Sequence, residues 1–414
     1  MEILQFGEGV FLRAFLDWMV QLMNERCSFN AEITIVQPRG VGLNRASALL
    51  NAQSGRYTVV ERGMENGSRL ERFTPVNCVK RVIGGYDRSA LREAATDPAL
   101  RYVFSNTTEA GIVYSPGEDT FPAKVAYLLQ ARCAAGLPGL VFLPCELIER
   151  NGAALKDCVL KYLENDAETS RYVNSECRFF NTLVDRIVSG APSSADAERY
   201  QQQLGFGDGM IDCTEPFHFM AIESPDRDFS PLPPFTAAGL NVECVDDLAP
   251  YRTRKVRFLN GAHTGCVPGA LLDGIAEVAE MVANPKWRSF METMLREEVA
   301  PTVPLPEEEK TAYIDSVLER FGNPFAHHRL SAIALNSIAK WRVRILPSII
   351  DYQRLFNRVP PCLAHSLQLL IDFLLANPDL ADDAAAQRFF ASRPGRNEIL
   401  SNVSLWGTDC SGWF

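Results

Sequence analysis

The chain has 414 residues and a formal net charge of −10, with 47% hydrophobic and 22% charged residues. That length is enough for two domains with a sizeable core. An acidic chain has no surplus of basic residues to neutralise phosphates, so the composition argues against a nucleic-acid-binding protein. No apolar run approaches the 18 residues of a membrane span, so we expect neither nucleic acid nor membrane as a partner.

The cysteines and the first residues bear on the compartment. There are 11 cysteines, an odd number, and no CxxC pair occurs in the sequence. This usage favours reduced thiols over a disulfide framework. Met1 leads directly into EILQFG without the apolar stretch of a signal peptide. We therefore expect a cytoplasmic protein.

The first elements form a βαβ pattern. Residues 3–6 predict a short buried strand, residues 7–9 a turn, residues from 10 onward an amphipathic helix, and residues 33–36 a second strand. Further strands are predicted at 102–105 and 140–143, with a helix at 123–135 between them. Residues 57–85 contain β-branched runs that favour extra or antiparallel strands. The alternation of strands and helices predicts a parallel sheet with crossover helices.

Beyond about residue 245 the pattern becomes helical. A clear helical stripe is formed by Leu363, Leu367, Leu370, Ile371 and Leu374. Prolines at 301, 304 and 306 predict a break between helices. The fold class expected is α/β, with a Rossmann-type domain at residues 1–245 and a mainly α-helical domain, carrying substrate and catalytic residues, at 246–414.

The glycine turn at residues 7–9 is a candidate phosphate-binding turn. Gly7 permits a tight turn, and Gly9 lets the backbone approach a pyrophosphate at the start of the following helix. The third glycine of GxGxxG is replaced by Leu12. Placement between an apolar strand and an amphipathic helix strengthens this otherwise weak signal.

Other candidate cofactor contacts follow the predicted strands. The second strand ends in Gln37-Pro38-Arg39, without the carboxylate that usually binds the adenine ribose of NAD. Arg39 is either an acceptor of the 2′-phosphate of NADP or a solvated loop cation, so these residues leave NAD and NADP open. The loops at 105–111 and 144–146 are polar and suit ribose or nicotinamide, although helix capping is the alternative reading.

The segment from Lys255 to His263 carries the sharpest chemical signal. At about 100° per residue, Lys255, Asn260 and His263 share one face of a helix. Lysine can act as a base if burial and neighbouring cations lower its pKa, and Asn260 and His263 can donate hydrogen bonds to a substrate oxygen. The alternative is a solvated lysine and an ordinary polar histidine.

Taken together, five ordered motifs resemble the polyol-specific long-chain dehydrogenases, the mannitol dehydrogenase family. They are QFGEGVFLRAF at residues 5–15, SNTTEAG at 105–111, NTLVDRI at 181–187, the pattern Lys255-x4-Asn260-x2-His263, and NSIAK at 336–340. The resemblance runs from Gln5 to about Trp406. It implies a Rossmann-type domain, a helical domain, and dehydrogenase activity without a metal.

The resemblance also implies residue roles. The family's general base matches Lys255, its oxyanion-hole asparagines match Asn181 and Asn260, and a substrate-binding histidine matches His263. Candidate cofactor contacts are Phe6, Gly7, Gly9, Val10, Phe11, Arg39, Asn106, Thr107, Glu109 and Cys145. Candidate substrate contacts are Arg186, Asn336 and Lys340, with Arg342 and Arg344 as nearby cations.

Within the family, residues 104–111, 259–264 and 331–336 are similar to the branch that interconverts D-tagaturonate and D-altronate with NAD. Relatives acting on mannitol or mannonate usually have an arginine at the position of Ala332. We therefore expect an NAD-dependent oxidoreductase of this sugar-acid pair, with no metal. The alternatives are a fructuronate reductase (D-mannonate oxidoreductase), another sugar-alcohol dehydrogenase, an NAD-binding sensor, or a structural protein without a ligand.

Overall fold

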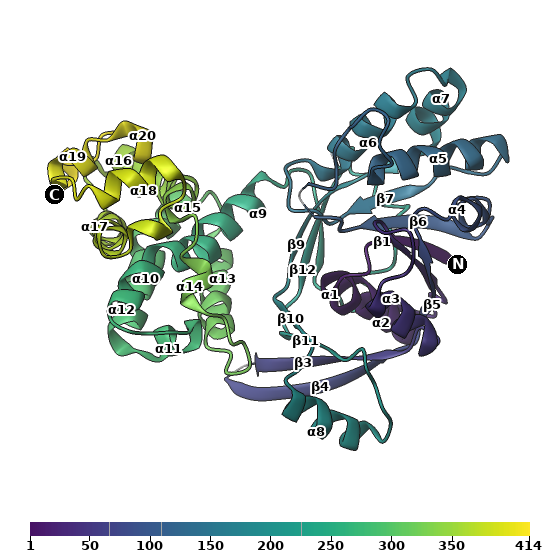
Figure 1. The fold of residues 1–414 in the computed structure, drawn as a ribbon, viewed down its shortest axis with the longest axis horizontal. Coiled ribbons are helices and arrows are strands. Elements are labelled where there is room, and N and C mark those ends of the chain that lie inside the picture. Colours follow the sequence, from purple (N-terminus) through teal and green to yellow (C-terminus); the bar gives the residue numbers. More distant parts are fainter. Residues whose placement is uncertain (66, 109, 225) are drawn as a thin grey trace. The chain divides into compact units, whose positions relative to one another are not determined.

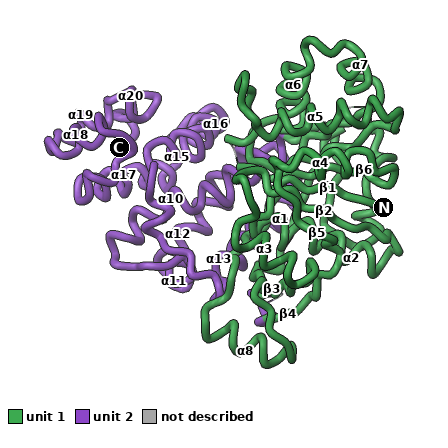
Figure 2. Tube along the Cα trace, turned by 45° about the vertical axis from the view of Figure 1, so that its right-hand side comes forward, with its two compact units in different colours: residues 1–62, 70–248 green, residues 63–69, 249–414 purple. Residues whose placement is uncertain are grey.

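The computed structural model describes residues 1–65, 67–108, 110–224 and 226–414, so Glu109 lies outside the described residues. The chain divides into two compact units (Figure 2). Unit 1 comprises residues 1–62 and 70–248, and unit 2 comprises residues 63–69 and 249–414. The sequence places the corresponding domain boundary at residue 245.

A six-stranded parallel sheet forms the centre of unit 1, in the order β5-β2-β1-β6-β7-β8. Its strands are β1 (Glu2–Phe6), β2 (Glu32–Gln37), β5 (Val79–Gly84), β6 (Leu100–Ser105), β7 (Val141–Pro144) and β8 (Arg178–Phe179). The strands predicted at 3–6, 33–36, 102–105 and 140–143 are confirmed. Because the strand order reverses beside β1, the carboxyl ends of β1, β2 and β6 form the switch point at which such sheets bind ligands.

Helices cover both faces of this sheet (Figure 1). Alternate side chains of β1 enter different cores: Ile3 packs with α1 and α2, whereas Leu4 and Phe6 pack with α4 to α7. The helices of unit 1 are α1 (Val10–Leu12), α2 (Trp18–Cys27), α3 (Arg45–Ala52), α4 (Arg88–Ala95), α5 (Phe121–Ala134), α6 (Asn151–Tyr162), α7 (Ala167–Glu176) and α8 (Ser194–Leu204). This doubly covered parallel sheet confirms the Rossmann-type prediction.

Two smaller sheets complete unit 1. One has the order β10-β11-β3-β4 and the other β13-β12-β9. Their strands are β3 (Tyr57–Glu65), β4 (Ser68–Val76), β9 (Asn181–Asp185), β10 (Val188–Gly190), β11 (Asp212–Thr214), β12 (Phe219–Glu223) and β13 (Val242–Val245). The extra strands predicted within residues 57–85 are confirmed as β3 and β4, whereas β5 joins the main sheet.

Unit 2 is helical and has one continuous hydrophobic core. Its helices are α9 (Ala249–Arg254), α10 (Gly261–Leu272), α11 (Val278–Ala283), α12 (Pro285–Thr293), α13 (Glu307–Phe321), α14 (Leu330–Ile333), α15 (Ser337–Arg344), α16 (Leu346–Phe356), α17 (Pro361–Ala376), α18 (Ala384–Ala391), α19 (Arg396–Leu400) and α20 (Val403–Trp406). The stripe predicted from Leu363 to Leu374 lies in α17. Within the described residues, no helix has the length and apolar character needed to cross a membrane.

Helix α10 packs very closely on α12. A Cβ atom at Gly269 would lie 2.2 Å from the ring of Trp287, which is buried. Glycine is therefore required at this point of contact. The tight packing fixes α10 against the core of unit 2.

One helical prediction is wrong. Ala332, Asn336 and Lys340 do not form a stripe on a single helix, because α14 ends at Ile333 and α15 starts at Ser337. Asn336 lies between them with φ of 54°, in the left-handed region that asparagine tolerates better than most residues. The chain changes direction at this residue, which the i, i+4 spacing could not indicate.

Candidate active site

The glycine turn lies at the carboxyl end of β1, at the switch point of the sheet. Gly7 has φ of +120°, and a Cβ atom there would lie 2.8 Å from the backbone oxygen of Asn106. Both observations require glycine. Around Gly9, the N-cap of α1, a Cβ would meet no heavy atom within 4 Å, which leaves the backbone open to a ligand.

The neighbours of this turn differ in accessibility. The side chain of Phe6 is buried against Phe121, with ring centroids 4.9 Å apart, so only its backbone can contact a cofactor. Val10 is 40% exposed. Phe11 is half-buried and stacks on Phe15 at 5.0 Å. The open positions of the turn are therefore Gly9 and Val10.

A group of ionisable side chains lies below the turn. Nη1 of Arg13 donates to the backbone oxygen of Glu8 at 2.7 Å, and Nη2 forms an ion pair with Asp212 at 3.2 Å. Tyr57 donates to Asp17 at 2.8 Å. Burial raises the pKa of both Asp17 and Asp212 to about 7. Sequence reasoning missed this group because its members lie up to two hundred residues apart.

The loop after β6 is held by a buried carboxylate. Glu146 accepts hydrogen bonds from the backbone and hydroxyl of Thr107, at 2.9 and 3.0 Å, and from the Ser105 hydroxyl at 3.0 Å. Burial raises the pKa of Glu146, although these donors oppose the shift. Asn106 donates to the backbone oxygen of Cys145 at 3.0 Å. Asn106 and Thr107 are thus placed at the carboxyl ends of the strands.

Cys145 is buried, and burial raises the pKa of its thiol. Its backbone N–H donates to the oxygen of Ser105 at 2.7 Å. A thiol without exposed surface has no route to a ligand in this structure, so Cys145 acts here as part of the frame between β6 and β7.

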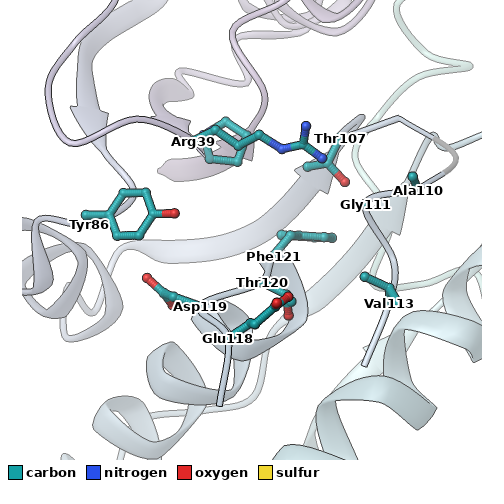
Figure 3. Close-up of a pocket in the computed structure, with 11 residues that line it drawn as sticks. Arg39, Tyr86, Thr107, Ala110, Gly111, Val113, Glu118, Asp119, Thr120 and Phe121 are labelled. Carbon is teal, nitrogen blue, oxygen red and sulfur yellow. The ribbon is translucent and has the colours of Figure 1, made fainter. Parts of the chain in front are cut away.

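A cavity of about 520 Å³ opens beside these strand ends (Figure 3). Its lining includes Pro38 and Arg39 after β2, Tyr86 after β5, Thr107, Ala110, Gly111 and Val113 after β6, and Glu118, Asp119, Thr120 and Phe121 at the start of α5. Such a volume suits part of a nucleotide. The sequence indicated Arg39 and Thr107 but gave no signal for Tyr86, Glu118 or Asp119, which come from loops without a motif.

Gln37 occupies the position at the end of β2 where a ribose-binding carboxylate is usual. Its side chain is buried and turns into its own loop, where Nε2 donates to the backbone oxygens of Arg39 and Gly42 and Oε1 accepts from the N–H of Asn44. Carboxylates instead lie at the start of α5. There Asp119 pairs with Arg88 at 2.6 Å and with the buried Lys124 at 3.1 Å.

Asn181 begins β9, where its amide is partly used. Nδ2 donates to Glu223 at 2.5 Å, and Oδ1 accepts from the N–H of Ala153 at 3.0 Å. An amide nitrogen carries two hydrogens, so one donor remains for a ligand.

Arg186, predicted as a substrate contact, is part of the interior of unit 1. Its guanidinium has no exposed surface and lies 4.1 Å from the ring of Trp18. It pairs with Glu61 at 3.2 Å and donates to the oxygens of Ala14 at 2.7 Å and Glu215 at 3.1 Å. Burial lowers its pKa to about 10. With all three nitrogens engaged, Arg186 serves the framework, and the function proposed below gives it no substrate contact.

In unit 2, Lys255 to Asn260 form a π-helical segment between α9 and α10. The N–H of Gly261 bonds to the oxygen of Val256, five residues earlier. The predicted angles along an α-helix are therefore wrong for this segment. Because an i→i+5 bond closes a wider turn, residue 260 comes round closer to residue 255 than the roughly 140° of an α-helix. The π segment brings Lys255 and Asn260, both half-buried, toward one side.

His263 follows on α10 and is buried. Its ring stacks on Phe321 with centroids 4.1 Å apart and meets the ring of His328 edge-on at 5.4 Å. Nε2 has no hydrogen-bond partner among the described residues. Burial lowers its pKa far below 6.5, helped by His328 and by the charges of Arg344, Arg320 and Lys340. His263 is therefore neutral at physiological pH.

Helix α15 carries two half-buried cations near this histidine. Lys340 donates to the backbone oxygen of Ile333 at 2.9 Å, and Arg344 donates to the hydroxyl of Thr264 at 3.3 Å. Burial lowers the pKa of both groups. Asn336, at the start of α15, is exposed. Among the described residues, no three His, Cys, Asp or Glu side chains come together as a metal site.

Two domain families match the chain: the mannitol dehydrogenase Rossmann domain at residues 1–230 and the mannitol dehydrogenase C-terminal domain at residues 247–386. Altronate oxidoreductase of Bacillus subtilis is 37% identical over 432 residues, covering 99% of this chain and 88% of the relative. Altronate oxidoreductase of Pectobacterium carotovorum is 40% identical over 388 residues, covering 90% and 78% respectively.

Solved structures share the fold. A substrate-free D-sorbitol dehydrogenase superposes with a TM-score of 0.82 at 21% identity, covering 98% of this chain and 88% of its own. Mannitol 2-dehydrogenase of Pseudomonas fluorescens, in complex with NAD and D-mannitol, gives 0.73 at 22% identity, covering 100% and 89%. The two matched domains and the near full-length relatives establish that this chain belongs to the mannitol dehydrogenase family and is a dehydrogenase.

Proposed function

We propose that this protein is an NAD-dependent oxidoreductase that interconverts D-tagaturonate and D-altronate. The observation that carries the proposal is the near full-length similarity to several altronate oxidoreductases. The coarser conclusion, a dehydrogenase of sugar acids or sugar alcohols, follows from the family. The choice of this sugar-acid pair depends on those relatives.

The residues of unit 1 fit a nicotinamide dinucleotide. Gly7 leaves room that any Cβ would fill, Gly9 is open, and the 520 Å³ cavity lies at the carboxyl ends of the parallel strands. The NAD complex of mannitol 2-dehydrogenase supports NAD as the cofactor. Bound NAD supplies the hydride acceptor for alcohol oxidation. Gly9, Asn106 and Thr107 are the residues we expect to hold it.

Lys255 takes the hydroxyl proton when the alcohol is oxidised and returns it to the oxygen when the ketone is reduced. Asn260 and Asn181 donate hydrogen bonds to the oxygen while it carries negative charge. A neutral His263 donates one further hydrogen bond, and Asn336 and Lys340 contact the substrate. These donors need no metal to stabilise the oxygen, so treatment with a chelator should leave activity unchanged.

A panel of substrates assayed with NADH tests the proposal. D-tagaturonate, D-fructuronate and neutral ketoses are compared by the rate of NADH consumption, and NADPH is compared with NADH. The highest kcat/KM is expected for D-tagaturonate with NADH. Preference for fructuronate or a neutral ketose would reassign the enzyme within its family, and NADH binding without turnover of any of them would indicate a sensor.

A further inference from the structure

Sugar acids differ from sugar alcohols by a carboxylate, so an enzyme for sugar acids needs a cation to receive it. We propose that Arg344, assisted by Lys340 one helical turn before it on α15, binds the carboxylate of the substrate. This inference rests on the proposed function and assigns a group that the sequence alone left open between Arg342 and Arg344.

The first argument is position within unit 2. Nη1 of Arg344 donates to the Thr264 hydroxyl at 3.3 Å, and that hydroxyl donates to the backbone oxygen of Asn260 at 2.9 Å. Arg344 thus lies against the segment that carries Asn260 and His263. Thr264 is one helical turn beyond Asn260, about 6 Å along the axis. Three hydroxyl-bearing carbons separate the reacting carbon from the carboxylate in altronate, and such a chain can span this distance.

The second argument is charge. Arg344, Arg320 and Lys340 all act on the neutral His263 and lower its pKa, so positive charge is concentrated around it. In the part of the chain that the structure describes, neither Arg344 nor Lys340 forms a salt bridge. The nearest acid, Asp382, accepts hydrogen bonds from the N–H groups of Ile338 at 2.9 Å and Ala339 at 2.5 Å. Its carboxylate therefore caps α15.

The third argument is the cost of this arrangement. Burial is the cause that lowers the pKa of Arg344, and it is the largest cause for Lys340. A partly desolvated charge without a counter-ion is unfavourable, and an anion that replaces the lost water offsets the cost. A guanidinium suits a carboxylate because its planar fork can form two parallel hydrogen bonds. The His263 ring, with its unpartnered buried Nε2, adds a polar atom to the same place.

Neighbouring arginines are less suitable. Arg342 is exposed and donates to the backbone oxygen of Ser404 at 3.5 Å. Arg257 is paired with Asp351 at 2.6 Å and donates to Thr302. Their donors face other partners, which leaves Arg344 as the guanidinium beside the Asn260–Thr264 segment with the weakest compensation.

Kinetics with charged and neutral substrates test this assignment. The variants Arg344→Gln and Arg344→Lys are compared with Arg342→Gln, a control on the same helix. For Arg344→Gln, kcat/KM for D-tagaturonate should fall by roughly 10- to 100-fold, the range for a lost hydrogen bond to a charged group, while kcat/KM for the neutral ketose D-tagatose stays unchanged. Arg344→Lys should recover part of the loss, and Arg342→Gln should resemble the wild type.

Equal losses for both substrates, or no loss for either, would overturn the assignment. Thermal unfolding of each variant identifies a folding defect, and Arg344→Lys then remains as the second test. If the wild type turns over no keto-uronate, the proposed function fails separately. The carboxylate subsite is then tested by stabilisation with D-altronate: a Tm increase in the wild type that Arg344→Gln loses supports it, and no increase in the wild type contradicts it.

Discussion

Unit 1 and unit 2 each bury a group of charged side chains, and they balance those charges differently. In unit 1, Arg186 pairs with Glu61, and Arg13 pairs with Asp212. In unit 2, Arg344 and Lys340 lie near a neutral histidine and form no ion pair with the described residues. The same residue type therefore serves two purposes. A guanidinium with every donor engaged holds the fold, whereas one with weak compensation is available to a ligand.

The largest effect should come from removing the proposed base of unit 2. Lys255→Ala should lower kcat by on the order of 10² to 10⁴, because proton transfer loses its acceptor, while NADH binding measured by fluorescence persists. Lys286→Ala is the control, since Lys286 is an exposed partner of Asp273. Unchanged turnover in Lys255→Ala would remove the base assignment.

The paired arginine of unit 1 should behave in the opposite way. Arg186→Met should lower the free energy of unfolding by roughly 3–5 kcal/mol, because it leaves Glu61 buried without its partner. Urea unfolding measures this loss. The folded variant should retain the wild-type KM for substrate. A raised KM with unchanged stability would return Arg186 to the list of substrate contacts and break the comparison.

The pH dependence of stability should distinguish the two groups. The pKa of Asp17 is about 7 in the folded protein against an ordinary value of 3.8, so the native state binds more protons between these values. Its contribution to stability is full below about pH 4 and is lost as the pH rises through 7. Asp17→Asn should therefore lose less stability than the wild type between pH 5 and pH 8. Asp372→Asn, at an exposed ion pair, should retain the wild-type slope.

His263 should show the reverse slope and a smaller effect. Its pKa lies below the ordinary 6.5, so the unfolded chain takes up the proton first and stability falls as the pH drops below 6.5. His263→Gln should reduce this loss between pH 7 and pH 5 in urea unfolding. His365→Gln is the control, because His365 is exposed. An identical slope in the wild type and His263→Gln would contradict the assignment of a neutral, buried His263.

Local patterns predicted much of the fold. Strand periodicity located the main sheet, the glycine turn placed its ligand end, and the leucine stripe of α17 marked the helical region. The wrong predictions concern features that depend on distant residues or small backbone differences. The π segment at 255–260 and the left-handed Asn336 have no signature in side-chain spacing. The burial of Arg186 depends on Glu61 and Trp18, which lie far away in the sequence.

The candidate site was predictable in its motif residues but not in their environment. Lys255, Asn260 and His263 were identified by their spacing and by family resemblance. That Glu146 holds the loop after β6, or that Arg344 rather than Arg342 lies beside Thr264, depends on tertiary packing. A single sequence gives residue types, whereas these assignments need the partners of each side chain.

The close contact between Gly269 and Trp287 has a consequence for adaptability. Helix α10 carries His263 and Thr264, and it cannot slide or rotate without the tryptophan ring colliding with its backbone. The conformational entropy of this segment is thus lost when the chain folds and need not be lost again at each turnover. Evolution toward a new substrate would then proceed by exchanging side chains around a fixed helix, as at positions 332 and 344, rather than by moving the helix itself.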